Sequence, residues 1–162
     1  MMKKLIIILP LIFLLNSCEN APTITKVDDS RGQALVDTQG NPWRFSDHKG
    51  KWIIVNYWAS WCKPCITEVP ELEAFHQAHK EKDAIVLGVN YDFVSAAETA
   101  QLAKKYGMSY PVLISEQDPR IQLGSDPVMV LPTTFVINPE GQVIAALVGE
   151  QSQASLEDII NE

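Results

Sequence analysis

The run Trp58-Ala59-Ser60-Trp61-Cys62-Lys63-Pro64-Cys65 is the centre around which the rest of this chain is arranged. It follows an apolar run, residues 52–57, that has the length and β-branched content of a buried strand, and it leads into a segment with helical periodicity. The two cysteines are therefore predicted at a strand-to-helix junction, with Cys62 at the start of the helix. There, unpaired backbone N–H groups and the helix dipole stabilise a thiolate.

The spacing of the two cysteines predicts redox chemistry. Cys65 lies one helical turn after Cys62, so the two sulfurs can close a small disulfide ring and reopen it. Such a ring closes almost no chain and so is poorly suited to stabilising a fold. A zinc site is the alternative, but it needs two more ligands, and the chain offers only Cys18 and three scattered histidines. We predict no metal and no cofactor, and we expect His76 and His79 to be solvated positions on one helix.

Three motifs follow one another along the chain: residues 55–65, then Glu68-Val69-Pro70-Glu71-Leu72, and far downstream Leu131-Pro132-Thr133-Thr134-Phe135. Together they resemble the thioredoxin superfamily and, more narrowly, the TlpA-like and ResA-like bacterial thiol-disulfide oxidoreductases, over residues 33–149. The resemblance implies an enzyme with an α/β, thioredoxin-like fold, in which a central mixed sheet is flanked by helices and preceded by an N-terminal β-hairpin.

Residues 1–17 are predicted to be a signal peptide. Lys3 and Lys4 form a basic start, and residues 5–15 form an apolar core too short to span a bilayer. The Leu15-Asn16-Ser17-Cys18 that follows resembles a bacterial lipoprotein processing site, so Cys18 is predicted to be lipidated. A free thiol or an intermolecular disulfide is the alternative for this odd cysteine. We therefore expect an exported protein, lipid-anchored to a bacterial membrane, with its domain facing the periplasm or another extracytoplasmic space.

The charge of the mature chain is strongly negative. The first 17 residues hold two of the 13 basic side chains and none of the 20 acidic ones, so the net charge changes from -7 to -9 when they are removed. An acidic surface disfavours nucleic acid and anionic lipid headgroups as partners, so membrane attachment would depend on the acyl chains of Cys18. Partners with basic surfaces would be attracted.

The mature chain is predicted to form one domain behind a tether. Residues 18–31 are polar and contain Pro22, and we interpret them as the lipid-anchored tether. The alternative is an extra edge strand through residues 23–27. Residues 32–162 are long enough for one thioredoxin-like domain with an adequate core.

The remaining elements are predicted from hydrophobic periodicity and from start and stop signals. Ser95-Ala96-Ala97-Glu98 has the form of a capping box, and Gly107 ends the helix that this box opens. Ser155 is predicted to open a last, short helix. Residues 118–130 depart from the pattern of the family, so their structure stays open. The predicted strands are 33–37, 43–45, 52–57, 84–90, 111–114, 133–137 and 142–148.

The cysteine pair is assigned the chemistry of thiol-disulfide exchange. As a thiolate, Cys62 attacks a partner disulfide, and Cys65 resolves the mixed disulfide that results. Lys63 adds a positive charge near the sulfur and favours the thiolate, unless solvent screens it. Pro64 limits the backbone and starts the helix. Trp61 is expected at the surface and Trp58 partly buried, both beside the disulfide.

Proton transfer is the second predicted role. Thioredoxin proper has a buried acid on the strand, six residues before its first cysteine, and that position here is Asn56, which cannot titrate. Glu68 lies one helical turn beyond Cys65, and the resemblance places the corresponding glutamate near the disulfide. We predict that Glu68 has a raised pKa and handles the proton of Cys65. The alternative is a solvent-facing glutamate.

The third predicted part of the site is the loop around Pro132. Leu131-Pro132-Thr133 resembles the cis-proline loop that packs against the disulfide in this superfamily. Leu131 and Thr133 are predicted to contact an extended partner chain. An ordinary trans proline at the start of an edge strand is the alternative.

Within this chemistry the resemblance favours a monomeric reductase of selected protein disulfides, of the type that serves cytochrome c maturation. Apocytochrome c is one expected partner, and a membrane thiol-disulfide electron donor is another. An oxidase or isomerase of secreted proteins is the alternative within the same chemistry. A peroxidase is disfavoured because the cysteines form a Cys-x-x-Cys pair. A non-catalytic binding module is disfavoured because both cysteines are present.

Overall fold

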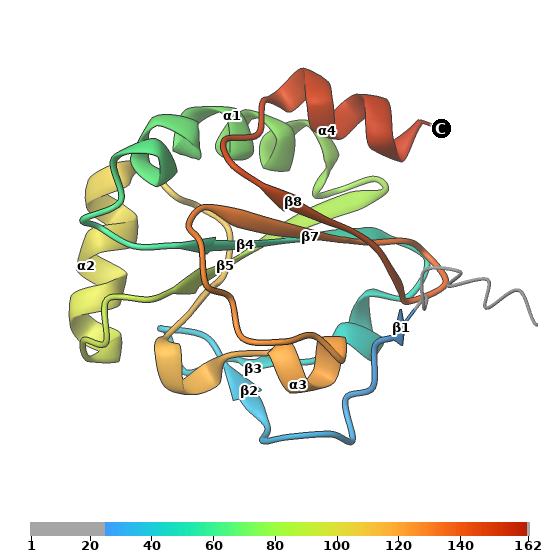
Figure 1. Ribbon diagram of the computed structural model, residues 1–162, viewed down its shortest axis with the longest axis horizontal. Coiled ribbons are helices and arrows are strands. Elements are labelled where there is room, and N and C mark those ends of the chain that lie inside the picture. The colour runs from blue at the N-terminus through green and yellow to red at the C-terminus, as the bar shows by residue number, and fades with distance from the viewer. Residues whose placement is uncertain (1–24, 162) are drawn as a thin grey trace, which may run out of the picture.

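The computed structural model describes residues 25–161 of the chain. Four strands come first, helices and strands then alternate, and a hairpin and a last helix close the fold (Figure 1). In chain order they are β1 (Thr25–Lys26), β2 (Leu35–Val36), β3 (Pro42–Trp43), β4 (Trp52–Trp58), α1 (Lys63–His79), β5 (Ala84–Asn90), α2 (Ala96–Tyr106), β6 (Val112–Leu113), α3 (Arg120–Leu123), β7 (Thr133–Ile137), β8 (Gln142–Val148) and α4 (Gln153–Ile160). Short 3-10 helices occupy Phe45–His48 and Ser115–Gln117.

A mixed six-stranded sheet, in the order β1-β8-β7-β4-β5-β6, forms the middle of the molecule. The central strand β4 pairs in parallel with β5 and antiparallel with β7. β2 and β3 form a separate antiparallel hairpin. This arrangement confirms the predicted thioredoxin-like fold with its small N-terminal hairpin.

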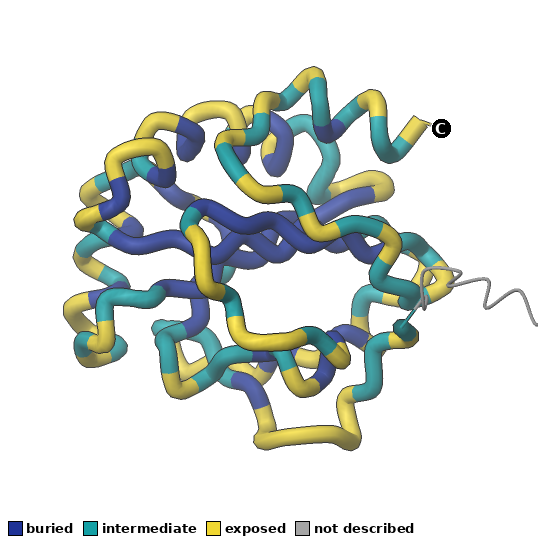
Figure 2. Tube along the Cα trace, in the orientation of Figure 1, coloured by how far each residue is buried: buried dark blue, intermediate teal, exposed yellow. Residues whose placement is uncertain are grey.

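Helices and the hairpin cover the two faces of the sheet. In Figure 1, α1 and α4 lie above the sheet, α2 lies at the left end of the sheet, and α3 lies with the β2–β3 hairpin below it. β4, β5, β6 and β7 are almost continuously buried, as the dark blue tube in Figure 2 shows, whereas the residues of β8 are half-buried or exposed. Because successive strand residues point to opposite faces, alternate residues of β4 enter two separate apolar cores.

Several predicted elements are confirmed, together with the sequence signals that predicted where they begin and end. β5, β7 and β8 have the predicted limits. α2 begins at a capping box in which Ser95 and Glu98 bond each other's backbone N–H groups, and it ends at Gly107 with φ 82°. A positive φ costs glycine little, which is why the helix stops there.

The domain begins earlier in the chain than predicted. β1 pairs with β8, and the Val27 N–H donates to the Gly141 carbonyl oxygen at 2.8 Å. Asp29 accepts from the backbone N–H groups of Phe45 and Ser46 at 2.9 and 2.8 Å. Residues 25–31 therefore belong to the domain, and the edge strand that sequence analysis kept as an alternative is present.

Three further predictions were wrong in detail. The last helix begins after Ser152, whose hydroxyl accepts from the Ser155 N–H, so Ser155 is the third residue of the helix and not its cap. His76 is buried and not solvated, because its ring packs against Tyr110 and its Nδ1 accepts from the Val86 N–H at 3.2 Å. Trp58 is fully buried, where partial burial was expected.

The predicted signal peptide and the lipidation site at Cys18 lie outside the described residues. Within residues 25–161, every helix is too short or too polar to cross a bilayer.

Candidate active site

Cys62 and Cys65 form a disulfide at the junction of β4 and α1. The S–S distance is 2.02 Å, and the two Cα atoms lie 5.3 Å apart. Cys62 is 5% exposed and Cys65 is completely buried. A partner molecule therefore approaches Cys62 first.

The first turn of α1 explains this placement. Cys62 is the N-cap residue, and its sulfur accepts from the Cys65 N–H at 3.3 Å. Pro64 lies in the first turn, where its missing N–H leaves no donor unpaired. A sulfur at this position meets the positive end of the helix dipole, which favours the thiolate over the thiol.

The segment before the cysteines is held by a residue that sequence analysis did not single out. Asp92, just after β5, accepts from the Ser60 N–H at 2.8 Å and from the Ser60 hydroxyl at 2.7 Å. Asn90 Nδ2 also donates to this carboxylate, at 2.6 Å. The end of β5 thus fixes the turn that presents Trp61 and Cys62. An acidic residue two positions after a buried strand was the available signal.

Pro132 lies at the same edge of the sheet. The Leu131–Pro132 peptide bond is cis, as predicted. The Thr133 hydroxyl donates to the Val130 carbonyl oxygen at 2.7 Å, and the Pro132 carbonyl oxygen accepts from the Gly149 N–H at 2.9 Å. These bonds attach the proline loop to β7 on one side and to the end of β8 on the other.

Exposed apolar side chains lie at this edge of the sheet, where β4 and β5 end and β7 begins. Trp61 is 71% exposed beside Cys62. Met129 and Val130 are 87% and 54% exposed just before the cis proline. Apolar surface gathered in this way is typical of a binding site for another molecule.

Glu68 is the buried carboxylate of the site. It lies one turn after Cys65 on α1 and is only 1% exposed. Its Oε1 accepts from Asn56 Nδ2 at 2.8 Å, and its Oε2 accepts from the backbone N–H of Gln151 at 2.9 Å. The same Asn56 nitrogen donates to Thr134 Oγ1 at 3.0 Å. The Glu68 carboxylate is therefore held by Asn56 on β4 and by Gln151 in the loop after β8. Thr134 on β7 in turn holds the Asn56 amide.

Burial raises the pKa of Glu68 to about 7. The N–H of Gln151 and the amide of Asn56 act in the opposite direction because they stabilise the charged form, whereas the nearby Glu150 charge raises the pKa further. A carboxyl with a pKa near neutrality can both take up and release a proton under ordinary conditions.

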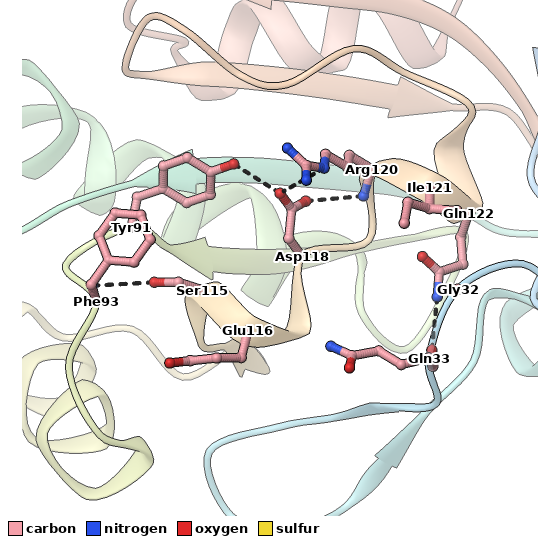
Figure 3. A pocket seen from close by; sticks show the side chains of 10 residues that line it. All are labelled: Gly32, Gln33, Tyr91, Phe93, Ser115, Glu116, Asp118, Arg120, Ile121 and Gln122. Carbon is pink, nitrogen blue, oxygen red and sulfur yellow. Dashed lines mark hydrogen bonds and ion pairs between the residues drawn. The ribbon is translucent and has the colours of Figure 1, made fainter.

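A pocket lies on the other face of the sheet, below the end of β5 (Figure 3). Phe93, at φ 55°, and Tyr91 form one wall, and Asp118 lies at the centre. Asp118 accepts from the hydroxyls of Tyr57 and Tyr91 at 2.8 Å each and from the Arg120 backbone N–H at 3.0 Å. The Arg120 guanidinium lies 3.6 Å from its carboxylate. This cluster ties α3 to the sheet.

The structure brings most of the predicted site residues together. Cys62, Lys63, Pro64 and Cys65 form the first turn of α1 and Trp61 precedes it, while Leu131, Pro132 and Thr133 lie at the start of β7. The partners of Glu68 were not found from sequence. Gln151 reaches it from 83 residues further along the chain, and Asn56 was noticed only as a residue that cannot titrate. Among residues 25–161 there is no group of three or more potential metal ligands.

Comparisons with known proteins agree with this geometry. The pattern of the AhpC/TSA family matches residues 20–146 of the chain. The thiol-disulfide oxidoreductase ResA of Bacillus subtilis (strain 168) is 32% identical to the chain over 139 residues, which cover 86% of this chain and 76% of ResA.

Solved structures of similar proteins share the fold. A thiol:disulfide interchange protein of the thioredoxin family from Chlorobium tepidum TLS superposes with a TM-score of 0.71 at 27% identity, over 87% of this chain and 95% of that one. The pneumococcal exposed lipoprotein thioredoxin Etrx1 from Streptococcus pneumoniae superposes with a TM-score of 0.65 at 26% identity, over 80% of this chain and 97% of that one.

Proposed function

The chain belongs to the AhpC/TSA family of thioredoxin-like proteins and is a thiol-disulfide oxidoreductase similar to ResA, and from this we propose that it is a reductase of selected extracytoplasmic protein disulfides. The observation that carries the proposal is a buried carboxyl, Glu68, one helical turn from the buried Cys65 of the redox pair. A group that takes up the proton of the resolving cysteine favours release of a reduced partner.

In the proposed reaction the protein starts as the dithiol. The Cys62 thiolate attacks one sulfur of the partner disulfide, so that a mixed disulfide forms and the partner's other sulfur leaves as a thiolate, which takes a proton from solvent. The exposed indole of Trp61 and the apolar side chains before Pro132 support the contact with the partner.

The second step releases the partner. Cys65 loses its proton to Glu68 and attacks the Cys62 sulfur, which forms the Cys62–Cys65 disulfide and expels the partner's second sulfur as a thiolate. Two electrons pass to the partner, whose two sulfurs end as thiols after protonation. A membrane dithiol donor then returns two electrons to the protein.

We further propose that the protein is exported and anchored through a lipidated Cys18, with residues 19–24 as the remaining tether. The lipobox-like residues before Cys18 support this, as does the similarity to Etrx1, which is itself a lipoprotein. Apocytochrome c is the partner that the resemblance to ResA-like proteins suggests. Mass spectrometry of the membrane fraction tests the anchor, because Cys18→Ala should abolish acylation.

An oxidase or isomerase of secreted proteins is the second candidate. The motif Cys-x-x-Cys serves electron flow in both directions, since the thiolate pKa values of proteins with this motif range from about 3.5 to about 7. The exposed Trp61 and the cis-proline loop suit either direction, so the reduction potential has to discriminate between them.

The deciding experiment measures the reduction potential of the Cys62–Cys65 pair in the full chain, equilibrated against glutathione or dithiothreitol. A value near or below that of thioredoxin, about -270 mV, is expected for the reductase, and it should be accompanied by reduction of insulin disulfides. A value near -120 mV would identify an oxidant. A lack of insulin reduction at a low potential would favour a binding module.

The role of Glu68 has its own test. In Glu68→Gln the pH dependence of the Cys65 thiol titration should change, while in Glu81→Gln, an exposed glutamate beyond the end of α1, it should stay as in the wild type. Unchanged thiol titrations in Glu68→Gln would remove the carboxyl from the mechanism.

A further inference from the structure

Gly88 on β5 lets two aromatic side chains approach the sheet closely. It lies opposite Asn56 in the parallel pair of β4 and β5. A Cβ atom built on Gly88 would lie 3.2 Å from Tyr110 Cε2 and 3.3 Å from Trp58 Nε1. Both aromatic groups therefore rest against the backbone beside Asn56, on the face of the sheet that α1 covers.

Three buried polar atoms in this neighbourhood have no hydrogen-bond partner within residues 25–161. They are Asn56 Oδ1, Trp58 Nε1 and the Tyr110 hydroxyl oxygen. Asn56 already uses its amide nitrogen on Glu68 and Thr134, so its free capacity is that of an acceptor. The Trp58 indole can only donate, and the Tyr110 hydroxyl can donate and accept.

The unused groups are chemically complementary. Buried polar groups are almost always hydrogen-bonded, because an unpaired one loses its hydration without compensation. The acceptor belongs to the residue that pairs with Gly88, the two donors belong to the aromatic residues that rest against Gly88, and none of the three atoms bonds another. A single water has two donor and two acceptor positions, and buried waters typically make about three hydrogen bonds to groups of this kind.

We propose that one buried water above Gly88 joins Asn56 Oδ1, Trp58 Nε1 and the Tyr110 hydroxyl, and that Tyr110 is thereby a positioning residue for Glu68. The water donates to Asn56 and accepts from the two aromatic donors. Because the amide of Asn56 is then held at its oxygen as well as at its nitrogen, its N–H groups stay directed at Glu68 and Thr134. This inference depends on the proposed function in one respect, which is the role of the Glu68 proton in the reaction.

The charges around Glu68 and Tyr110 support this assignment of donors. Burial, then the charges of Glu68 and Glu73, raise the pKa of Tyr110, so its hydroxyl keeps its proton and remains a donor. His76 packs against the Tyr110 ring at 5.7 Å between ring centroids, and burial lowers the pKa of His76 and favours the neutral ring. Glu150 faces Glu68 from the loop after β8 and raises its pKa.

The consequence is a coupling between Tyr110 and the buried carboxyl. Donation from Asn56 stabilises the charged form of Glu68 and so lowers its pKa. Without the Tyr110 hydroxyl the water loses a partner, the amide of Asn56 is held less firmly, and the charged form of Glu68 loses support. Removing the hydroxyl should therefore raise the pKa of Glu68.

The test compares Tyr110→Phe with Tyr106→Phe in the full, oxidised chain. Tyr106 is the matched control, because its ring also packs against Trp58 but its hydroxyl is not among the buried unpaired atoms. The Glu68 pKa is measured by ¹³C NMR of the labelled carboxyl. We expect Tyr110→Phe to raise it by roughly half a pH unit to one pH unit and Tyr106→Phe to leave it unchanged. Equal pKa values in all three proteins would overturn the proposal.

The stability of Tyr110→Phe gives a second discrimination. Removing a buried hydroxyl that has no partner is neutral or stabilising, whereas removing one that is bonded destabilises the fold. The denaturation midpoint of Tyr110→Phe should fall below that of the wild type. An equal or higher midpoint would contradict the water-bridged arrangement.

A measurement on the wild type keeps the proposal testable if the variant fails to fold. Cross-relaxation between the Trp58 indole Nε1–H and a long-lived water should be visible by NMR, and its absence would overturn the proposal. None of these measurements involves electron transfer. A Glu68 pKa that responds to Tyr110 together with a strongly oxidising potential would therefore refute the reductase and leave this inference standing.

Discussion

Adjacent residues of the central strand bind two carboxylates on opposite faces of the sheet. The two carboxylates differ in the donors and charges that surround them. Asn56 donates to Glu68 on the α1 face, while Tyr57 donates to Asp118 on the other face. Asp118 has two tyrosine hydroxyls and the guanidinium of Arg120 around it. Within residues 25–161, the donors to Glu68 are the neutral amides of Asn56 and Gln151.

The difference shows how one sheet gives two carboxylates different surroundings on its two faces. At Asp118, a nearby guanidinium and two tyrosine hydroxyls hold the carboxylate to its neighbours. Burial with neutral donors alone leaves Glu68 with a pKa of about 7. Only the second arrangement suits proton exchange with Cys65, and it lies on the same helix as the disulfide. The following experiments test this contrast.

Glu68→Gln should give the largest effect, in the pH dependence of stability. The wild type loses stability as pH rises from about 4.5 to about 7, because the carboxyl ionises near 4.5 in the unfolded chain but only near 7 in the folded one. Between pH 4 and pH 8, the free energy of unfolding of the wild type should therefore fall by roughly 3 kcal/mol relative to that of the variant, which lacks the titrating carboxyl. Denaturant unfolding with the disulfide intact measures this, with Glu81→Gln as control. Parallel stability curves would contradict the assignment.

Asp118→Asn should destabilise the fold by about 2 kcal/mol, because two tyrosine hydroxyls and Arg120 lose a charged acceptor. The rate of disulfide exchange should stay within roughly twofold of the wild type, since the cluster lies on the face away from Glu68. Chemical denaturation and a stopped-flow thiol assay check both. A large loss of rate with little loss of stability would place Asp118 in the chemistry.

Tyr57→Phe should cost about 1 kcal/mol of stability, since it removes one hydrogen bond to Asp118 from a fully buried side chain. Tyr91→Phe removes the other hydroxyl from a more exposed position and should cost less. If the double variant loses as much stability as the two single variants together, Asp118 holds the two tyrosines independently.

Lys63→Gln should have the smallest effect. Lys63 is exposed beside Cys62, so solvent and salt screen its charge. The rate of Cys62 alkylation at neutral pH should fall by less than roughly threefold at low salt, and the difference should vanish near 1 M salt. A larger effect that persists at high salt would mean that Lys63 sets the reactivity of Cys62 directly.

Much of the fold was predictable because its signals are local. The spacing of Cys62 and Cys65 after an apolar run places the disulfide at a helix start, and the box at Ser95 with Gly107 delimits α2. The wrong predictions concern residues whose environment is supplied from elsewhere. β1 exists because β8 offers an unpaired edge, and His76 is buried because Tyr110 and β5 lie against its helix.

The sequence by itself determined the redox pair and most of the order of strands and helices, because each depends on residues within a few positions of one another, and the family resemblance implied the cis-proline loop. Only the tertiary structure decided that Glu68 is buried, that Asn56 and Gln151 bond to it, and that Tyr110 rests on Gly88 beside them. The physical reason is that a pKa depends on solvent and charge from every direction. Those surroundings come from segments that are far apart in the chain and meet only in the folded protein.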